Sequence, residues 1–348
     1  MPRPLIDPEL VRIRDKYAGS RCLRDRWPEI KKLVAAGKSD EAEALIKSCI
    51  AANPRLQVRA KVITTALDLR REFLRDQRDL EGQVKAILAR LSEDLVSILI
   101  GEAGSDGLIS HGRLNRIQAE MRALVIAAWA EILALIKAAV RDAIKTSLSI
   151  TMTSAQAGLD HGKTQEAAKA KMSVDSATYQ TIYDRVKKRQ LEKGLFANKY
   201  RGQYQSGTTL SRRVWDVRDK SVQTLRRTVA SGVAQGRPAS AIAADVKAQT
   251  LAGRVSKYMP NPGQGVYRSA YKNALRMVRT ETNNAYVDAQ LEYSIHKGYK
   301  VLWNLSPGHP EEDECDDLAG KEYDPESVPY PNHPNEACFL TTVLPQIG

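Results

Sequence analysis

The chain has 348 residues, of which 43% are hydrophobic and only 6% aromatic, and its formal net charge is +12. This length allows two or three domains, and a core filled mainly by Leu, Ile, Val and Ala favours packed helices over a β-sandwich. No apolar run follows the N-terminal charges, and Glu131 and Lys137 interrupt the longest apolar stretch, so we expect neither secretion nor a membrane span. Four scattered cysteines exclude a disulfide-built scaffold, and Cys22 and Cys49 are expected to be ordinary buried thiols.

The first half of the chain has a helical pattern. Residues 1–53 are expected to form short helices, and residues 54–156 a long antiparallel helical hairpin. Apolar residues recur at steps of three and four between Val62 and Ile98, and again between Leu114 and Leu135. A glycine-rich stretch between these stripes predicts the connecting loop. We interpret the stripes as an intramolecular core, and a seam that recruits other copies of the chain is the alternative.

The second half is expected to be helical up to a small terminal lobe. Residues 157–207 have poor apolar periodicity and are expected to form a hinge and basic linker. Helical patterning resumes at residue 210, and a last helix is predicted from about Tyr267 to Lys297. Residues 299–305 alternate and predict a strand, residues 320–323 are a candidate for a second short strand, and several prolines predict loops between them and the end of the chain. The expected fold is therefore mainly α: an extended N-terminal hairpin and a helical C-terminal domain that ends in a small α+β, loop-rich lobe.

The charge is distributed unevenly along the chain. From Arg185 to Arg227 there are thirteen Lys and Arg against three acidic residues, whereas the chain from Val301 onward has ten acidic residues and one lysine. A basic stretch can follow a phosphate backbone without reading base sequence, so double-stranded DNA is a candidate partner. A solvated helix face and an acidic partner protein are the alternatives. The predicted DNA-facing residues are Lys187, Lys188, Arg189, Arg212, Arg213, Arg226 and Arg227.

Three segments of the C-terminal half occur in a characteristic order. They are Leu210-Ser-Arg-Arg-Val-Trp215, the helical segment Arg279-Thr-Glu-Thr-Asn-Asn-Ala-Tyr286, and an ending that runs from Trp303 through Asp313-Glu-Cys to His333-Pro-Asn-Glu-Ala-Cys338. Together they resemble the phage Mu F-type head morphogenesis domain over about residues 208–343. We therefore expect residues 208–348 to form such a domain, with the lobe at its end.

The resemblance implies a structural minor head protein of a tailed bacteriophage. Such a protein is assembled in the host cytoplasm and lies in the capsid interior near the portal vertex, where it binds the portal protein or the major capsid protein. The implied role is in head assembly, DNA packaging or DNA ejection. No glycine-rich phosphate loop, Ser-His-Asp arrangement or His-Glu-x-x-His is found, so we expect neither enzymatic activity nor a small-molecule substrate.

The end of the chain carries a candidate metal site. The family pattern often has further cysteines here, whereas this chain has Glu312 and Glu336 in those places. Neutral imidazole and thiolate suit a tetrahedral site, so a structural Zn²⁺ is the suggested cofactor. Its candidate ligands are His309, Cys315, His333 and Cys338. A disulfide between the two cysteines, formed once the particle leaves the reducing cell, and a lobe with neither feature are the alternatives.

The lobe needs a docking contact, because about 50 residues with several prolines have little core of their own. The natural docking side chains are Leu302 and Trp303. Arg279 and Glu281 lie two residues apart and therefore point to different sides of their helix. One of them is expected to tie the lobe to that helix, and a solvated helix face is the alternative.

Two further functions stay open at this point. The first is a nucleic-acid-binding protein with a zinc-stabilised lobe that acts outside any virion. The second is a metal-dependent nuclease that uses His309, Asp313, His333 and Asn335, although their spacing matches no nuclease motif.

Overall fold

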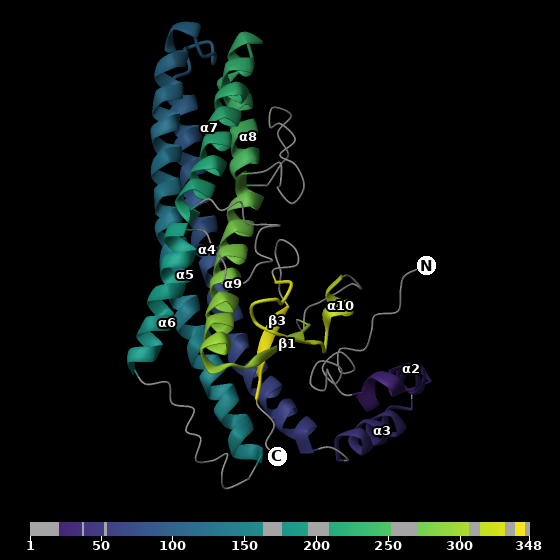
Figure 1. Ribbon diagram of the computed structural model, residues 1–348. Helices are drawn as coiled ribbons and strands as arrows, with labels where there is room; N and C mark the ends of the chain where they lie inside the picture. The colour runs from purple at the N-terminus through teal and green to yellow at the C-terminus, as the bar shows by residue number, and fades with distance from the viewer. Residues whose placement is uncertain are drawn as a thin grey trace.

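The computed structural model shows an elongated helical bundle with a small sheet near its C-terminal end (Figure 1). This arrangement confirms the expected fold class. The structure describes residues 21–36, 38–51, 54–162, 176–193, 209–251, 270–305, 314–330 and 338–344.

A long hairpin forms one side of the bundle. Helix α4 (Pro54–Gly101) and helix α5 (Leu114–Gly162) lie side by side, joined by a loop that ends in the 3-10 turn η1 (His111–Arg113) (Figure 1). Their apolar stripes face each other, with Leu95 and Ile132 fully buried. The predicted hairpin is thus confirmed, and α5 runs six residues beyond residue 156.

Length and composition alone would allow the helical stretch His111–Gly158, which comprises η1 and most of α5, to cross a membrane. In the structure, only 39% of the most apolar 18-residue segment of this stretch is buried. Core helices of helical bundles meet the same criterion.

Three further helices pack along the hairpin. Helix α7 (Leu210–Ala234) contacts α5, helix α8 (Ala239–Thr250) contacts α4, and helix α9 (Ala270–Lys297) contacts both (Figure 1). The turn between α7 and α8 is tied to the hairpin loop, because the amide of Ala239 donates to the carbonyl of Gly107 at 2.9 Å. Glycine suits position 107, where φ is +75°.

Part of the expected linker is helical. Helix α6 (Ser176–Lys188) and the π-helical turn η2 (Arg189–Lys193) pack against α9. The sequence pattern did not indicate this helix because only Ile182 and Val186 are buried on it, too few to make a stripe.

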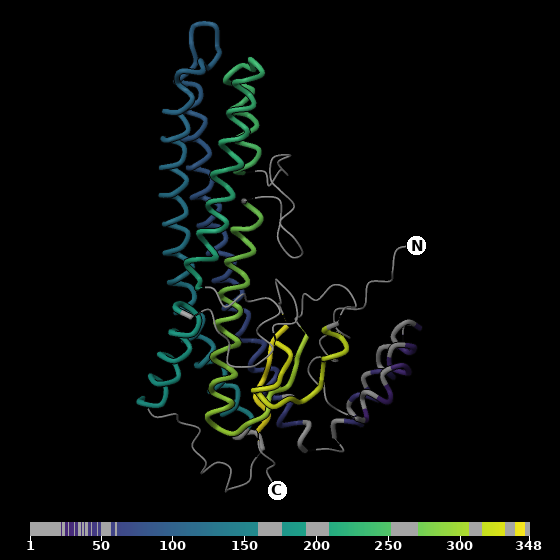
Figure 2. The backbone as a smooth tube through the Cα atoms, turned by 45° about the horizontal axis from the view of Figure 1, so that its top comes forward, coloured from purple at the N-terminus to yellow at the C-terminus, as the bar shows by residue number. Residues whose placement is uncertain are grey.

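The lobe is built on a three-stranded antiparallel sheet of order β2-β1-β3, which lies beside α9 (Figure 2). The strands are β1 (Lys300–Asn304), β2 (Glu322–Tyr323) and β3 (Phe339–Val343). A short helix, α10 (Glu314–Leu318), lies between β1 and β2 along the chain. The alternation of residues 299–305 predicted β1, and a second short strand was expected at residues 320–323, where β2 lies, whereas β3 was missed.

Two short helices precede the hairpin and are joined by a disulfide. Cys22 in α2 (Arg21–Ala35) is bonded to Cys49 in α3 (Ser39–Ala51), with 5.8 Å between their Cα atoms. The expectation of two buried thiols was therefore wrong. A tight connection folds α3 back on α2, which brings the start of one helix beside the end of the other.

Candidate functional site

Helix α9 is buried on all sides over residues 281–294. This segment overlaps the motif that carries the family resemblance, yet many of its residues are polar. Buried polar groups are costly unless they are hydrogen-bonded, so their partners reveal what the helix does. The buried polar residues are Glu281, Thr282, Asn283, Asn284, Asp288, Gln290, Glu292 and Ser294.

Three carboxylates form an acidic face on α9. Glu281, Asp288 and Glu292 follow one another at steps of seven and four, which places them on the same side of the helix. This side meets α7 and the α6–η2 segment. The guanidinium of Arg213 in α7 forms a bidentate ion pair with the carboxylate of Glu281, with 2.9 Å between Nε and Oε1.

Arg189 of η2 binds the other two carboxylates together. Its guanidinium donates to Asp288 at 3.2 Å and to Glu292 at 2.9 Å. Gln190 donates to Asp288 at 2.9 Å, and Arg185 pairs with Glu292. Burial opposes the charge on Arg189, but the two carboxylates outweigh it and hold the pKa of the guanidinium above its usual value.

A second face of α9 carries amides and binds the lobe. The side-chain amide of Asn283 donates to the hydroxyl of Tyr330, and its oxygen accepts from Arg70 of α4 at 2.9 Å. Two helical turns further on, the side-chain amide of Gln290 donates to the carbonyl of Leu340 in β3 at 2.6 Å. These bonds dock the lobe on α9.

Arg70 is the residue where the hairpin, α9 and the lobe meet. Its side chain is buried, and its guanidinium carbon lies 4.8 Å from the ring centre of Tyr286, 5.0 Å from that of Phe339 and 5.7 Å from that of Phe73. Burial raises the pKa of Tyr286, with Arg70 acting in the opposite direction. Sequence reasoning missed Arg70, although a signal exists: it lies four residues after Ala66 and three before Phe73, within the apolar stripe.

The predicted docking residues take different roles. Arg279 pairs with Glu81 of α4, with 2.8 Å between Nη2 and Oε2, and Glu281 pairs with Arg213 of α7. Their described partners therefore lie on other helices, and the described bonds from α9 to the lobe come from different side chains. Trp303 is fully buried in the lobe, with its ring centre 5.3 Å from that of Tyr330.

Two of the seven predicted DNA-facing residues are turned inward. The side chains of Arg189 and Arg213 are only 15% and 16% exposed, because the buried carboxylates of α9 need cationic partners. For these two the prediction was wrong. The remaining five lie wholly or partly at the surface: Lys187, Lys188, Arg212, Arg226 and Arg227.

The candidate zinc site is only partly described. Cys315 and Cys338 are both buried in the lobe and are not joined in a disulfide. Two buried thiols in one small lobe fit half of a Cys₂His₂ ligand set. The other two ligands, His309 and His333, lie outside the described residues, and no group of three His, Cys, Asp or Glu that could hold a metal is found within the described part of the chain. The zinc site stays a prediction.

No protein-family model, curated protein or solved structure matches this chain. The resemblance to the Mu F-type domain therefore depends on the quoted residues alone. The geometry itself shows that arginines of α7 and η2 bind the carboxylates of α9 and so hold these helices together.

Proposed function

We propose that this chain is a structural, non-enzymatic minor head protein of a tailed bacteriophage. In this proposal it lies in the capsid interior near the portal vertex and binds the portal protein or the major capsid protein. The observation that carries the proposal is the role of the Arg279–Tyr286 motif. Its polar side chains bond to α4, α7 and the lobe, so the motif is the joint of an extended scaffold.

The shape of the molecule supports an assembly role. Helix α4 has 48 residues, which at 1.5 Å per residue is about 70 Å. The lobe lies near one end of this rod, and the bonded loops of the hairpin and the α7–α8 turn lie at the other (Figure 1). A rigid rod with two distinct ends can bridge partners that are far apart in a particle.

A role in DNA packaging or ejection is part of the proposal. Arg226 and Arg227 are exposed side by side on α7, and Arg212 lies on the same helix with its side chain 69% exposed. Arginines on an exposed helix face can contact phosphates, and such contacts weaken steeply with salt. Together with Lys187 and Lys188, these three are the residues through which packaged DNA is expected to contact the chain.

Co-sedimentation with the portal protein encoded in the same genome tests the proposal. We expect the purified chain to sediment with portal assemblies at physiological salt, and to be found in the head fraction of the virion. The variant Arg226→Glu/Arg227→Glu should keep portal binding and lose any binding to duplex DNA. The proposal would be overturned by tight, salt-dependent binding to duplex DNA together with no binding to portal or capsid protein, which is the behaviour of the nucleic-acid-binding alternative.

Metal analysis and a nuclease assay address the remaining alternatives. About one zinc per chain, lost in Cys315→Ser, would support the metal site, whereas substoichiometric zinc would refute it. The proposal expects duplex DNA to stay intact with the chain and Mg²⁺. Cleavage that is abolished by His309→Ala would instead support the nuclease.

A further inference from the structure

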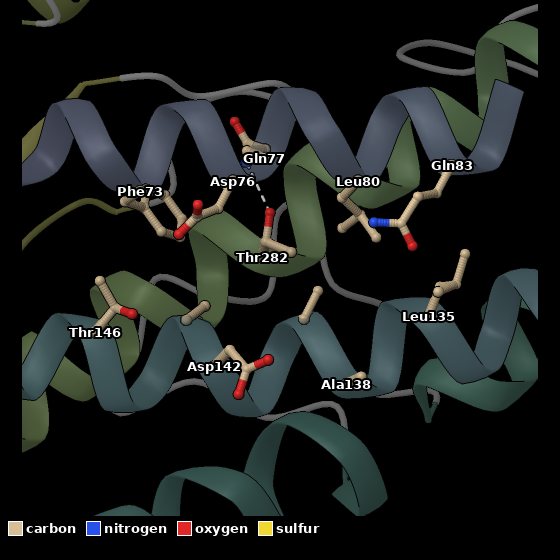
Figure 3. Close-up of a pocket in the computed structure, with 12 residues that line it drawn as sticks. Phe73, Asp76, Gln77, Leu80, Gln83, Leu135, Ala138, Asp142, Thr146 and Thr282 are labelled. Carbon is tan, nitrogen blue, oxygen red and sulfur yellow. Dashed lines mark hydrogen bonds between the residues drawn. The ribbon is translucent and has the colours of Figure 1, made fainter.

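A groove opens between the two helices of the hairpin. It has a volume of about 310 Å³ and its floor is formed by α9 (Figure 3). The lining side chains come from α4, α5 and α9: Phe73, Asp76, Gln77, Leu80, Gln83, Leu135, Ala138, Ala139, Asp142, Ala143, Thr146 and Thr282.

The groove exists because small residues of α5 stand opposite large ones of α4. On the α5 side Ala138, Ala139 and Ala143 line the groove, and on the α4 side Phe73 and Leu80 do, so the two helices do not fill the space between them. Figure 3 shows Ala138 across from Leu80. The floor of the groove is held in place, since Gln77 donates to the hydroxyl of Thr282 at 2.7 Å. This bond holds α9 against α4 at the bottom of the groove.

The mouth of the groove is acidic. Asp76 on α4 and Asp142 on α5 are both exposed and lie on opposite walls (Figure 3). The described ion pair of Asp142 is a loose one with Lys145 at 3.8 Å, between two exposed side chains. No Lys or Arg is among the residues that line the groove. Largely apolar walls below two carboxylates suit a side chain with an aliphatic stem and a cationic end.

The surface around the groove suits a helix. The groove spans residues 73–83 of α4, which is about 15 Å or nearly three helical turns. Past residue 83, in the direction of the hairpin loop, Arg90 of α4 pairs with Glu131 of α5. Next to the groove, α5 exposes Ala130, Ala134 and Ala138, whose small side chains let another helix backbone approach closely.

We propose that the groove between α4 and α5 is a docking site for an amphipathic helix of a partner protein, with an Ala- and Leu-rich face that enters the groove and with Lys or Arg side chains that pair with Asp76 and Asp142. A second copy of this chain is a poorer occupant. Its net charge of +12 opposes self-association, and its basic segment around Arg189 is already packed against α9 in ion pairs.

A pair of designed peptides tests the proposal on the full chain. The first is a labelled helical peptide of about five turns with an Ala/Leu face flanked by lysines, and the second has glutamate in place of each lysine. We expect fluorescence anisotropy to show the lysine peptide binding at least about tenfold more tightly. Its affinity should fall about tenfold in Asp76→Asn/Asp142→Asn, and several-fold when salt is raised from about 0.05 to 0.5 M.

Matched variants distinguish binding in the groove from a general effect of negative surface charge. Asp79→Asn/Asp94→Asn removes the same charge from exposed sites on α4 outside the groove and should change affinity less than about twofold. Ala138→Trp fills the groove at an exposed position and should abolish binding, with unchanged thermal unfolding as the check on folding. Equal binding of both peptides, or equal effects of both double variants, would overturn the proposal. So would self-association in sedimentation velocity that Ala138→Trp removes, since the occupant would then be a second copy.

Discussion

At the scale of single residues, buried polar side chains join parts of the chain that lie far apart in sequence. Arg70 binds Asn283, which is 213 residues away, and stacks near aromatic rings of the hairpin, α9 and the lobe. Its neighbour Arg71 is exposed and pairs only with Asp68, three residues earlier in the same helix, among its described ion pairs. The two arginines thus form a natural comparison.

Arg70→Ala should lower the free energy of unfolding by about 3 kcal/mol, because it removes a buried hydrogen bond, cation–π contacts and the packing of a long stem. Arg71→Ala should cost no more than about 0.5 kcal/mol, the usual contribution of an exposed pair within a helix. Urea denaturation followed by circular dichroism measures both. A similar fall in the free energy of unfolding for the two variants would show that Arg70 does not hold the hairpin, α9 and the lobe together.

The burial of Tyr293 predicts that the free energy of unfolding falls at alkaline pH. Its side chain is buried, and no described residue hydrogen-bonds to its hydroxyl. Burial, with a smaller contribution from Tyr299, raises the pKa of Tyr293 well above the usual value of about 10. The unfolded chain therefore releases this proton at lower pH than the folded chain does, so stability is full below about pH 10 and is lost as pH rises further.

Tyr293→Phe should therefore be neutral or slightly stabilising at pH 7, since it removes a buried hydroxyl without a described partner. It should also lessen the fall in stability between about pH 9.5 and 11. Urea titrations at several pH values provide the measurement. A marked loss of stability at neutral pH would mean that the hydroxyl has a partner.

At the scale of elements, close approach of helices depends on particular glycines. A Cβ added to Gly232 of α7 would lie 2.6 Å from Cγ1 of Ile242 in α8, whereas one added to Gly82 of α4 would meet nothing within 4 Å. Gly232→Ala should therefore cost about 1–3 kcal/mol through overpacking, partly offset by better helix propensity. Gly82→Ala should instead stabilise the protein by up to about 1 kcal/mol. Thermal unfolding of both variants measures these changes in stability. A stabilising effect of Gly232→Ala would contradict the close packing of α7 on α8.

The ion pairs of Arg189 should hold α6 and η2 on α9. Arg189→Met leaves Asp288 and Glu292 buried without their shared partner, and breaking a buried pair in this way costs about 3–5 kcal/mol. We expect much of this to appear as local opening, with faster hydrogen exchange across residues 176–193. Arg212→Met removes an exposed pair with Asp216 and should leave exchange in that segment unchanged. Unchanged exchange in Arg189→Met would show that the apolar contacts of α6 are sufficient.

Elements with a long or regular pattern could be predicted from the sequence. The stripes of α4 and α5 and the alternation of β1 are visible locally, whereas α6 buries too few apolar residues and β3 follows a run of prolines that hides a five-residue strand. The site was less predictable, because ion pairs such as Arg213–Glu281 join residues 68 apart. The run of basic residues alone therefore led to the prediction that Arg189 and Arg213 face DNA, whereas both are mostly buried in ion pairs with α9.

At the scale of the whole molecule, the disulfide-linked helices at the N-terminal end should respond to redox conditions separately from the bundle. Helices α2 and α3 pack mainly on each other, and α3 is the one that meets the start of α4. The Cys22–Cys49 bond joins residues 27 apart in sequence, which corresponds to about 3.5 kcal/mol of unfolded-chain entropy. This stabilisation belongs to residues 21–51, because the core of the bundle lies elsewhere.

Reduction of the disulfide, or the double variant Cys22→Ala/Cys49→Ala, should therefore speed hydrogen exchange and proteolysis in residues 21–51 while the main thermal transition stays within about 2 °C. The control is to add the same reductant to the Cys22→Ala/Cys49→Ala variant. Because Cys315 and Cys338 are not linked, its hydrogen exchange and thermal unfolding should not change. A large shift of the main transition would mean that the N-terminal helices unfold together with the bundle. In that case the oxidation state of a single bond would govern the stability of the entire rod.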